Sequence, residues 1–280
     1  MVGMTGQGAN ARAGVISLLW IGLFLTPALT RAQSLWLDRD HPTTILVEAA
    51  HVDVDQTNEK FLSGVAFLDI RHEMSPTTAI VGELAYTRFA RAREEFLATP
   101  TSESSIGNPY IGIEDSGRES PFFGEFGVRV PLMDENDVGA EFTGLFSDLP
   151  RSWAFFPNTV PVQAAMNLRT PRTSEIRARL RFGPTFTIPT KSGLDSDLYG
   201  VYAWEMGYEG RSVRVGSALS GWVLFTGDFG NLGSRTVTQF EFHANFGAGK
   251  IRPGAVVRVP SGVASGYASS VVGLTLAYLP

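Results

Sequence analysis

The chain has 280 residues, of which 44% are hydrophobic and 18% are charged, and it contains 30 glycines, 19 phenylalanines and no cysteine. The lack of cysteine excludes a disulfide framework, a thiolate metal site and a cysteine nucleophile. The formal net charge of -5 gives no basic footprint, so we expect no nucleic-acid partner.

The start of the chain has the pattern of an export signal. Arg12 supplies a positive charge, residues 15–25 form an uninterrupted apolar run, and a small-x-small cleavage pattern ends at Ala32. The run is too short to cross a bilayer as a helix, which needs about 20 residues. We therefore predict a cleaved signal peptide at 1–32 and a mature domain at 33–280. An uncleaved N-terminal anchor is the alternative.

The rest of the chain alternates apolar and polar residues with a period of two, which is the pattern of two-faced β-strands. In one clear case Phe240, Phe242 and Phe246 share one face, and Glu241 and His243 share the other. The same pattern predicts strands over 43–53, 61–73, 77–91, 106–114, 120–131, 137–147, 159–169, 173–188, 196–208, 211–226, 235–248, 249–259 and 266–279. Turn residues separate these strands and no linker divides them, so we expect one all-β domain.

Strand length and the polar face favour a membrane barrel over a soluble sandwich or a lipocalin-like barrel. Many predicted strands exceed the usual length of about 5 to 6 residues and match the roughly 9 to 11 residues of a tilted membrane strand. Arg177, Arg179 and Arg181 share one face, which suits a wet lumen better than a dry core. We expect an all-β transmembrane antiparallel β-barrel. Because single-chain bacterial barrels have an even number of strands, 12 is the predicted number and 14 the alternative.

The polar face of the predicted strands carries many charges. We predict that the lumen is lined by Arg129, Arg169, Arg177, Arg179, Arg181, Arg214, Arg252, Arg258, Glu125, Glu141, Glu205, Glu241 and His243, together with Glu83, Glu114 and Lys250. One interpretation is a polar conduit whose arginine ladder eases the passage of an anionic solute. The other is an ion-pair network that fills a narrow interior and holds the barrel together.

No catalytic or metal-binding constellation stands out in the sequence. His243 lies between Glu241 and Asn245 on one strand face, but no serine occupies a nucleophile elbow. A membrane-embedded hydrolase that uses Ser217 or Ser220 is a distant alternative. The four histidines form no pair with metal-ligand spacing. We expect no enzyme activity, no cofactor and no metal.

The C-terminal segment resembles the last strand of bacterial outer-membrane barrels, which tends to end Gly-x-x-hydrophobic-x-aromatic. Gly273, Leu276 and Tyr278 match this assembly signal, whereas Leu279 and Pro280 depart from it by following the aromatic residue. The resemblance implies a location in the outer membrane of a Gram-negative cell. It also implies two partners, the membrane lipid and the barrel assembly machinery.

Asn108-Pro109-Tyr110-Ile111-Gly112 is similar to the Gly-Asp/Asn-Pro-Tyr-hydrophobic-Gly segment of a transporter-like family of outer-membrane proteins associated with aromatic-compound (phenol meta-pathway) operons. Residues 186–190, followed by a turn rich in Gly and Asp, are similar to the strand-loop-strand pattern of the same family. The resemblance implies a passive, porin-like channel or transporter for small solutes. The alternative is a non-conducting structural or surface-binding barrel.

Overall fold

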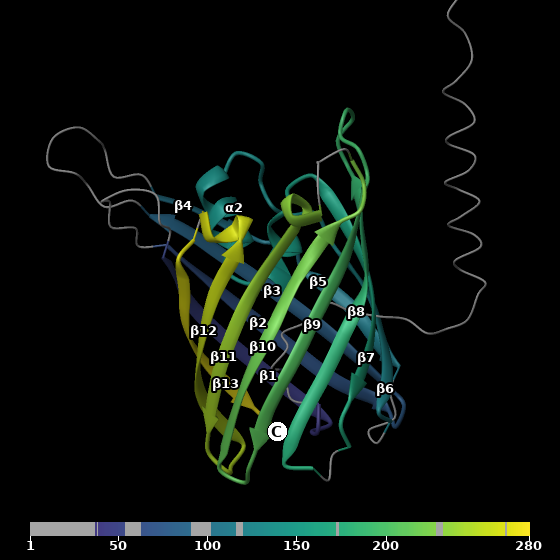
Figure 1. The fold of residues 1–280 in the computed structure, drawn as a ribbon, viewed down its shortest axis with the longest axis vertical. Helices are drawn as coiled ribbons and strands as arrows, with labels where there is room; N and C mark the ends of the chain where they lie inside the picture. The colour runs from purple at the N-terminus through teal and green to yellow at the C-terminus, as the bar shows by residue number, and fades with distance from the viewer. Residues whose placement is uncertain are drawn as a thin grey trace, which may run out of the picture.

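The strands close into an antiparallel β-barrel (Figure 1). The computed structural model describes residues 37, 39–53, 63–90, 102–115, 120–171, 174–227, 232–266 and 268–280. The predicted signal peptide at 1–32 lies outside the described residues, and its cleavage stays a prediction.

Consecutive strands pair with each other except β4 and β5, and β1 pairs with both β2 and β13, which closes the sheet. The strands are β1 (Thr43–Asp53), β2 (Gly64–Ser75), β3 (Thr78–Ala90), β4 (Ser102–Ile106), β5 (Tyr110–Asp115), β6 (Phe122–Arg129), β7 (Thr159–Arg169), β8 (Ile176–Pro189), β9 (Asp197–Glu209), β10 (Val213–Leu224), β11 (Thr236–Phe246), β12 (Ile251–Gly262) and β13 (Ser270–Tyr278). The short 3-10 helices η2 (Leu232–Arg235) and η3 (Val263–Gly266) lie in loops.

The barrel has twelve strands because β4 and β5 act as one. Both pair with β3: β4 lies opposite its end, where Ile106 faces Tyr86, and β5 lies opposite its beginning. The interruption falls at Gly107–Pro109, where the backbone turns to other partners inside the barrel. The predicted twelve-stranded barrel is therefore confirmed, although most of β4 falls between the strands predicted over 77–91 and 106–114.

The apolar phase of the strands faces outward, as the alternation predicted. On β11 the side chains of Phe240 and Phe242 are exposed, and Phe242 has 56% of its surface exposed, whereas Gln239 and Glu241 are buried inside the barrel. The two faces of a strand differ in this way because successive side chains point to opposite sides of the sheet. Among the described residues, no helix is both long enough and apolar enough to cross a membrane.

The strand predicted over 137–147 is wrong. Residues Val138–Leu145 form the helix α2, and the 3-10 helix η1 (Leu149–Phe155) follows it. Ala140, Thr143 and Gly144 are the buried residues of α2, and their spacing of three and four residues is helical, not two-fold. Glu141, predicted to line the lumen from a strand, lies instead half-buried on this helix.

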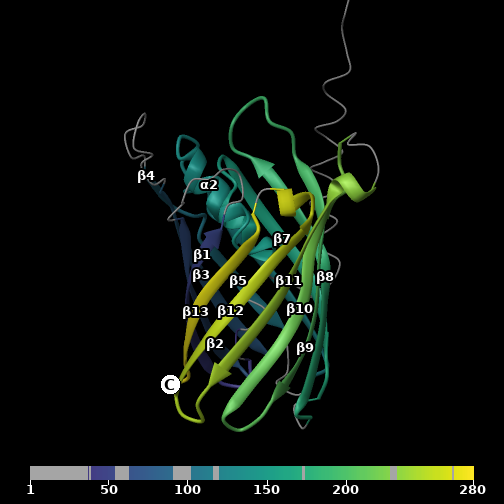
Figure 2. The ribbon, with the colours of Figure 1, turned by 60° about the vertical axis from the view of Figure 1, so that its left-hand side comes forward.

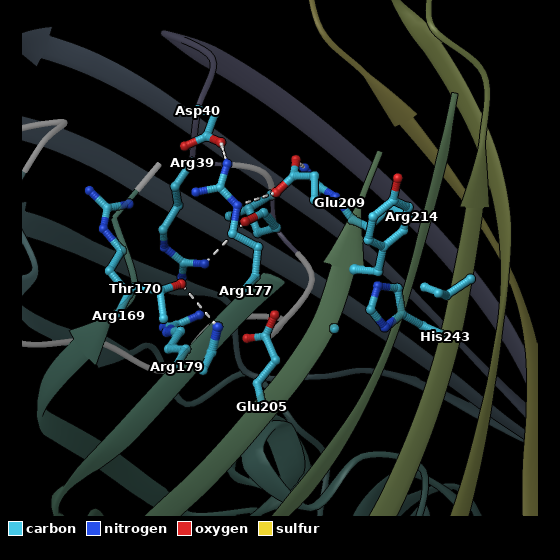
Figure 3. A pocket seen from close by; sticks show the side chains of 15 residues that line it. Arg39, Asp40, Arg169, Thr170, Arg177, Arg179, Glu205, Glu209, Arg214 and His243 are labelled. Carbon is cyan, nitrogen blue, oxygen red and sulfur yellow. Dashed lines mark hydrogen bonds and ion pairs between the residues drawn. The ribbon is translucent and has the colours of Figure 1, made fainter. Parts of the chain in front are cut away.

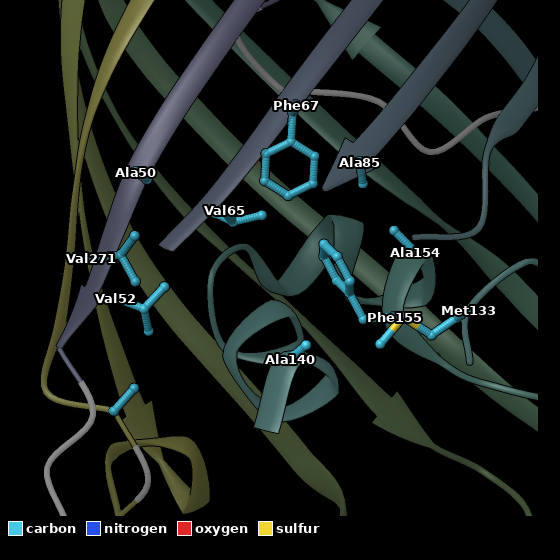
Figure 4. Packing of buried hydrophobic residues seen from close by; sticks show 11 residues of the cluster. Ala50, Val52, Val65, Phe67, Ala85, Met133, Ala140, Ala154, Phe155 and Val271 are labelled. Atoms are coloured by element: carbon cyan, nitrogen blue, oxygen red, sulfur yellow. The ribbon is translucent and has the colours of Figure 1, made fainter. Parts of the chain in front are cut away.

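The connection between β6 and β7, residues 130–158, folds into the barrel, and we call it the plug. Phe155 and Ala154 of η1 pack against Phe67 and Ala85 on the inner faces of β2 and β3 (Figure 4). The plug enters at one end of the barrel, and the C-terminus lies at the other (Figures 1 and 2). We call these the loop end and the turn end, since the short connections 170–175, 210–212 and 247–250 lie on the side of the C-terminus.

Candidate functional site: the lumen and its plug

The plug is fixed to the barrel wall by Asn108, at the interruption between β4 and β5. The side-chain oxygen of Asn108 accepts hydrogen bonds from the backbone of Leu132 (2.8 Å) and Met133 (2.9 Å). Its side-chain nitrogen donates to the carbonyl of Phe156 at 2.7 Å, and its backbone nitrogen donates to that of Ala154 at 2.6 Å. One fully buried residue therefore holds both the beginning and the end of the plug.

Close packing reinforces this attachment. A β-carbon on Gly107 would lie 2.8 Å from the carbonyl oxygen of Ala154, and one on Gly144 would overlap the ring of Phe155. Trp153 is completely buried, and its ring stacks on Phe156 and meets Tyr199 edge-on, with centroids 4.6 Å apart in the second pair. The plug is thus packed as tightly as a protein core.

Arg151 of the plug is the centre of a buried ionic network. Its guanidinium contacts Glu48 of β1 at 2.7 Å, Asp69 of β2 at 3.3 Å and Asp148 of the plug at 2.7 Å. The guanidinium also lies 3.6 Å from the ring centroid of Phe67, a cation–π contact. Burial lowers the pKa of Arg151, but the neighbouring carboxylates more than reverse this, so its pKa lies well above the ordinary value.

Arg258 of β12 extends the same network across the barrel. It contacts Glu48 at 2.5 Å, Asp148 at 3.2 Å and also Glu241 of β11. Arg151 and Arg258 have no exposed side-chain surface, and they share four carboxylates between them. Removing one partner from such a dry network leaves a buried charge uncompensated, which is costly.

A second network occupies the lumen nearer the turn end, around Glu125 of β6 and Glu114 of β5. Glu125 receives Arg179 at 2.8 Å and Arg181 at 3.1 Å, both from β8. Glu114 receives Arg71 at 2.5 Å and Arg39 at 3.1 Å. Arg39 precedes β1, so the segment leading into the first strand enters the lumen and contributes to its ion pairs.

A cavity of about 90 Å³ opens beside this second network (Figure 3). Its charged lining consists of Arg39, Asp40, Arg169, Arg177, Arg179, Glu205, Glu209 and Arg214, with His243 beside them. Arg177 bridges Asp40 at 3.1 Å and Glu209 at 2.9 Å, and Arg214 also contacts Glu209. Five arginines thus meet three carboxylates around one small space.

Most of the predicted lumen residues lie on the inner face. Arg129, Arg179, Arg181, Arg258, Glu125, Glu241, His243, Glu83 and Glu114 are buried there. Arg169, Arg177, Arg214, Arg252 and Glu205 are partly buried on the same face, most of them near the turn end. Glu141 lies on the plug helix, as described above, and Lys250 is exposed in the turn between β11 and β12.

The three residues of the predicted assembly signal fall on both faces of β13. Leu276 and Tyr278 face outward and are 47% and 41% exposed. Gly273 faces inward, where a β-carbon would lie 2.9 Å from side-chain atoms of Ala50 and Val256. The geometry thus gives Gly273 a packing role, and reading of these residues by an assembly machinery stays a prediction.

The serines named for a hydrolase do not approach His243. In the register of β10 and β11, His243 lies opposite Gly216, while Ser217 is on the outer face. Ser220 faces inward opposite Gln239, four residues along the strand, which corresponds to about 13 Å. Neither serine is therefore placed to pass a proton to this imidazole.

Sequence reasoning missed several residues that organise the lumen, among them Glu48, Asp69, Asp148 and Arg151 of the plug network. The first two lie in the inward phase of β1 and β2, and this phase was a signal that could have found them. It was obscured because inward neighbours such as Val52 are apolar, since they pack against the plug. Asp148 and Arg151 lie between the strands predicted over 137–147 and 159–169, where the sequence predicted no secondary structure.

Known proteins share the fold of this chain without close sequence similarity. The sequence matches no protein-family model and no curated protein. An outer membrane channel from Pseudomonas putida F1 is similar in structure, with a TM-score of 0.59 and 12% sequence identity over 91% of this chain and 99% of that chain. The translocator domain of the autotransporter NalP from Neisseria meningitidis has a TM-score of 0.51 and 11% identity over 97% and 98% of the two chains. The chain therefore has the closed, twelve-stranded antiparallel fold of outer-membrane β-barrels.

Proposed function

We propose that the protein is a passive outer-membrane channel or transporter for small solutes, whose conduit is closed by the plug. The observation that carries the proposal is the inner face itself: it carries charged side chains in both halves of the lumen, while the obstruction of the loop-end half comes from one inserted connection, residues 130–158. A lumen of this kind conducts when such a connection moves aside.

The proposed setting is the outer membrane of a Gram-negative cell, with the mature chain starting at Gln33. Short periplasmic turns and longer outer loops are the rule in such barrels, so the turn end would face the periplasm. Membrane lipid and the barrel assembly machinery are the proposed partners, the second through Gly273, Leu276 and Tyr278. Cell fractionation that found the chain soluble, or still carrying 1–32, would contradict this setting.

The resemblance to the transporter-like family of aromatic-compound operons supports the same proposal. Its Asn-Pro-Tyr segment coincides with Asn108, the residue that anchors the plug. The segment would then serve to hold a closing element in the lumen, and the solute is a small molecule whose identity we leave open.

A second candidate function is a non-conducting structural or surface-binding barrel. The observation that favours it is the dryness of the plug network, in which Arg151, Arg258 and Glu48 have no exposed side-chain surface. No enzymatic role forms part of either proposal.

Planar-bilayer conductance distinguishes the two candidates. We would replace residues 133–156 by a short Gly-Ser linker, which joins β6 and β7 directly because these strands already pair. The channel proposal expects low conductance for the full chain and steady, larger conductance for the shortened one. A shortened chain that folds, as judged by its circular dichroism and by resistance of the barrel to protease, and yet conducts no ions would favour the non-conducting barrel.

A further inference from the structure

The outer face of the barrel carries a shallow groove of about 530 Å³ near the loop end, across β12, β13, β1, β2 and β3. Its floor follows one row of the sheet, in which Ala255, Leu274, Ala49, Ala66 and Tyr86 lie side by side. The floor consists of small alanine side chains, and Leu274 and Tyr86, which are 71% and 44% exposed, rise from it. A depression of this shape fits a hydrocarbon chain lying along the wall.

The next row toward the loop end carries two polar side chains at one end of the groove. There His51 of β1, Gly64 of β2 and Arg88 of β3 lie side by side. Neighbouring strands lie about 4.8 Å apart, so the Cα atoms of His51 and Arg88 are about 10 Å apart, with only a glycine between them. Both side chains are exposed on the outer face.

Arg88 is the only lysine or arginine on the outer face of the strands that the structure describes. The other described strand arginines point into the lumen, where most of them meet carboxylates. A cation facing lipid is costly near the bilayer centre and is tolerated near the interface, where phosphate groups are available. The position of Arg88, two residues before the end of β3, matches the interface.

The imidazole ring of His51 is oriented by a hydrogen bond to the backbone of Ser63. Its Nδ1 lies 2.8 Å from the carbonyl oxygen of Ser63, and because a carbonyl only accepts, Nδ1 carries the proton. The other ring nitrogen, Nε2, then accepts a hydrogen bond in the neutral imidazole, so the group that it suits is a donor such as the P–OH of a singly ionised phosphate monoester. Asp53, the nearby acid, accepts a hydrogen bond from the hydroxyl of Ser269 at 2.8 Å.

We propose that this groove binds a phosphorylated glycolipid of the lipid A type, with an acyl chain over Ala49 and Ala66 and a phosphate between His51 and Arg88. The proposal rests on the outer-membrane setting proposed above, because the loop end then meets the outer leaflet. Phosphate suits the site since arginine offers it paired, charge-assisted hydrogen bonds. A second copy of the chain would not explain why the lone outward arginine stands at the end of an apolar groove.

Binding is measured by native mass spectrometry of the folded barrel in detergent, to which diphosphorylated lipid A, dephosphorylated lipid A or phosphatidylglycerol is added. We expect retention of one lipid A molecule, with at least about tenfold weaker binding after Arg88→Gln and after loss of the phosphates. Lys191→Gln, which removes another positive charge near the loop end, should leave binding unchanged.

The apolar part of the site is tested by Ala66→Leu, which fills the groove, with Ala164→Leu on the outer face of β7 as the matched control. Only the first should weaken binding. Equal binding by wild type, Arg88→Gln and Ala66→Leu would overturn the proposal, and so would equal binding of phosphatidylglycerol. A dimer that Ala66→Leu dissociates would identify the groove as a protein interface instead. Since the assay needs no conductance, its failure leaves the channel proposal standing, and a silent channel leaves the lipid site standing.

Discussion

Arginines and carboxylates line both halves of the lumen, but their arrangement differs between the two halves. Near the loop end, Arg151 and Arg258 are outnumbered by carboxylates and enclosed without solvent, because the plug fills the space around them. Near the turn end, arginines outnumber carboxylates around a cavity, and Arg177 keeps 22% of its side-chain surface exposed. The difference shows that charged lining alone does not determine whether a barrel interior is open. The connection that folds into it does.

The sharpest test of this contrast is to remove one arginine from each half. Arg151→Ala leaves Glu48, Asp69 and Asp148 buried without this counter-charge, so we expect a loss of about 3 to 5 kcal/mol in the free energy of unfolding. Urea unfolding of the refolded barrel in detergent measures it. Arg177→Ala is the matched control, for which a partly exposed pair predicts less than about 1 kcal/mol. Equal losses at both positions would contradict the proposed difference between the halves.

Packing of the plug is tested by one methyl group. Gly144→Ala forces a β-carbon into the ring of Phe155, and we expect a loss of about 1 to 3 kcal/mol together with more frequent conductance openings. Gly249→Ala, in the turn between β11 and β12, adds the same methyl group where no atom lies within 4 Å. That variant should match the wild type, and an unchanged Gly144→Ala would show that the plug can give way without cost.

The arginine row of β8 tests the turn-end half. Replacing Arg177, Arg179 and Arg181 by Gln removes three positive charges beside the cavity while keeping the strand. In the plug-shortened chain, the reversal potential under a salt gradient should shift toward cation preference, more at low than at high salt. Unchanged selectivity would leave the channel proposal intact and assign these arginines to holding Glu125 and Glu209.

The smallest effect concerns Glu135, on the exposed part of the plug. Lys191 contacts it at 2.8 Å, and hydrogen bonds from Lys191 and Asn158 lower the pKa of this carboxyl. A carboxyl with a lowered pKa stabilises the folded state at neutral pH, and this contribution is lost as the pH falls through the lowered value. The hydrogen-exchange protection factors of residues 190–196, which are corrected for the intrinsic effect of pH, should therefore fall in acid, and less so in Glu135→Gln. The same loss of protection in both proteins would exclude this contact as its cause.

The barrel itself was predictable because each wall strand has one environment on each face. Outward-facing positions such as Phe240 and Phe242 are apolar and lumen-facing ones such as Glu241 are polar, so a period of two survives in the sequence. The segment 137–147 also shows a period of two, but only by coincidence, since the spacing of its apolar residues fits a strand as well as a short helix. Its helical state is fixed by packing against η1 and β3, which local sequence does not encode.

The partners of the charged residues were less predictable than their direction. The alternation of the strand predicts that Arg179 and Arg181 point inward. Their partner Glu125 comes from β6, two strands away, and its position along the barrel axis depends on the register of the pairings β6–β7 and β7–β8. Arg39 precedes the first strand, where no periodicity operates. The sequence therefore indicates which residues face the lumen, and the fold decides which charges meet.

The ion pair between Glu48 and Arg258 has a consequence for how the barrel is assembled. It joins β1 to β12 across β13, so it spans the seam where the first and last strands meet, residues 210 positions apart in sequence. Pairing so distant in sequence is entropically expensive and forms late. Arg151 of the plug already bonds Glu48 and Asp148, and Asp148 in turn contacts Arg258. A plug docked on β1 and β2 would thus present Asp148 and Glu48 as partners for Arg258 when β12 arrives. The segment that closes the lumen would in this way also help the first and last strands to pair.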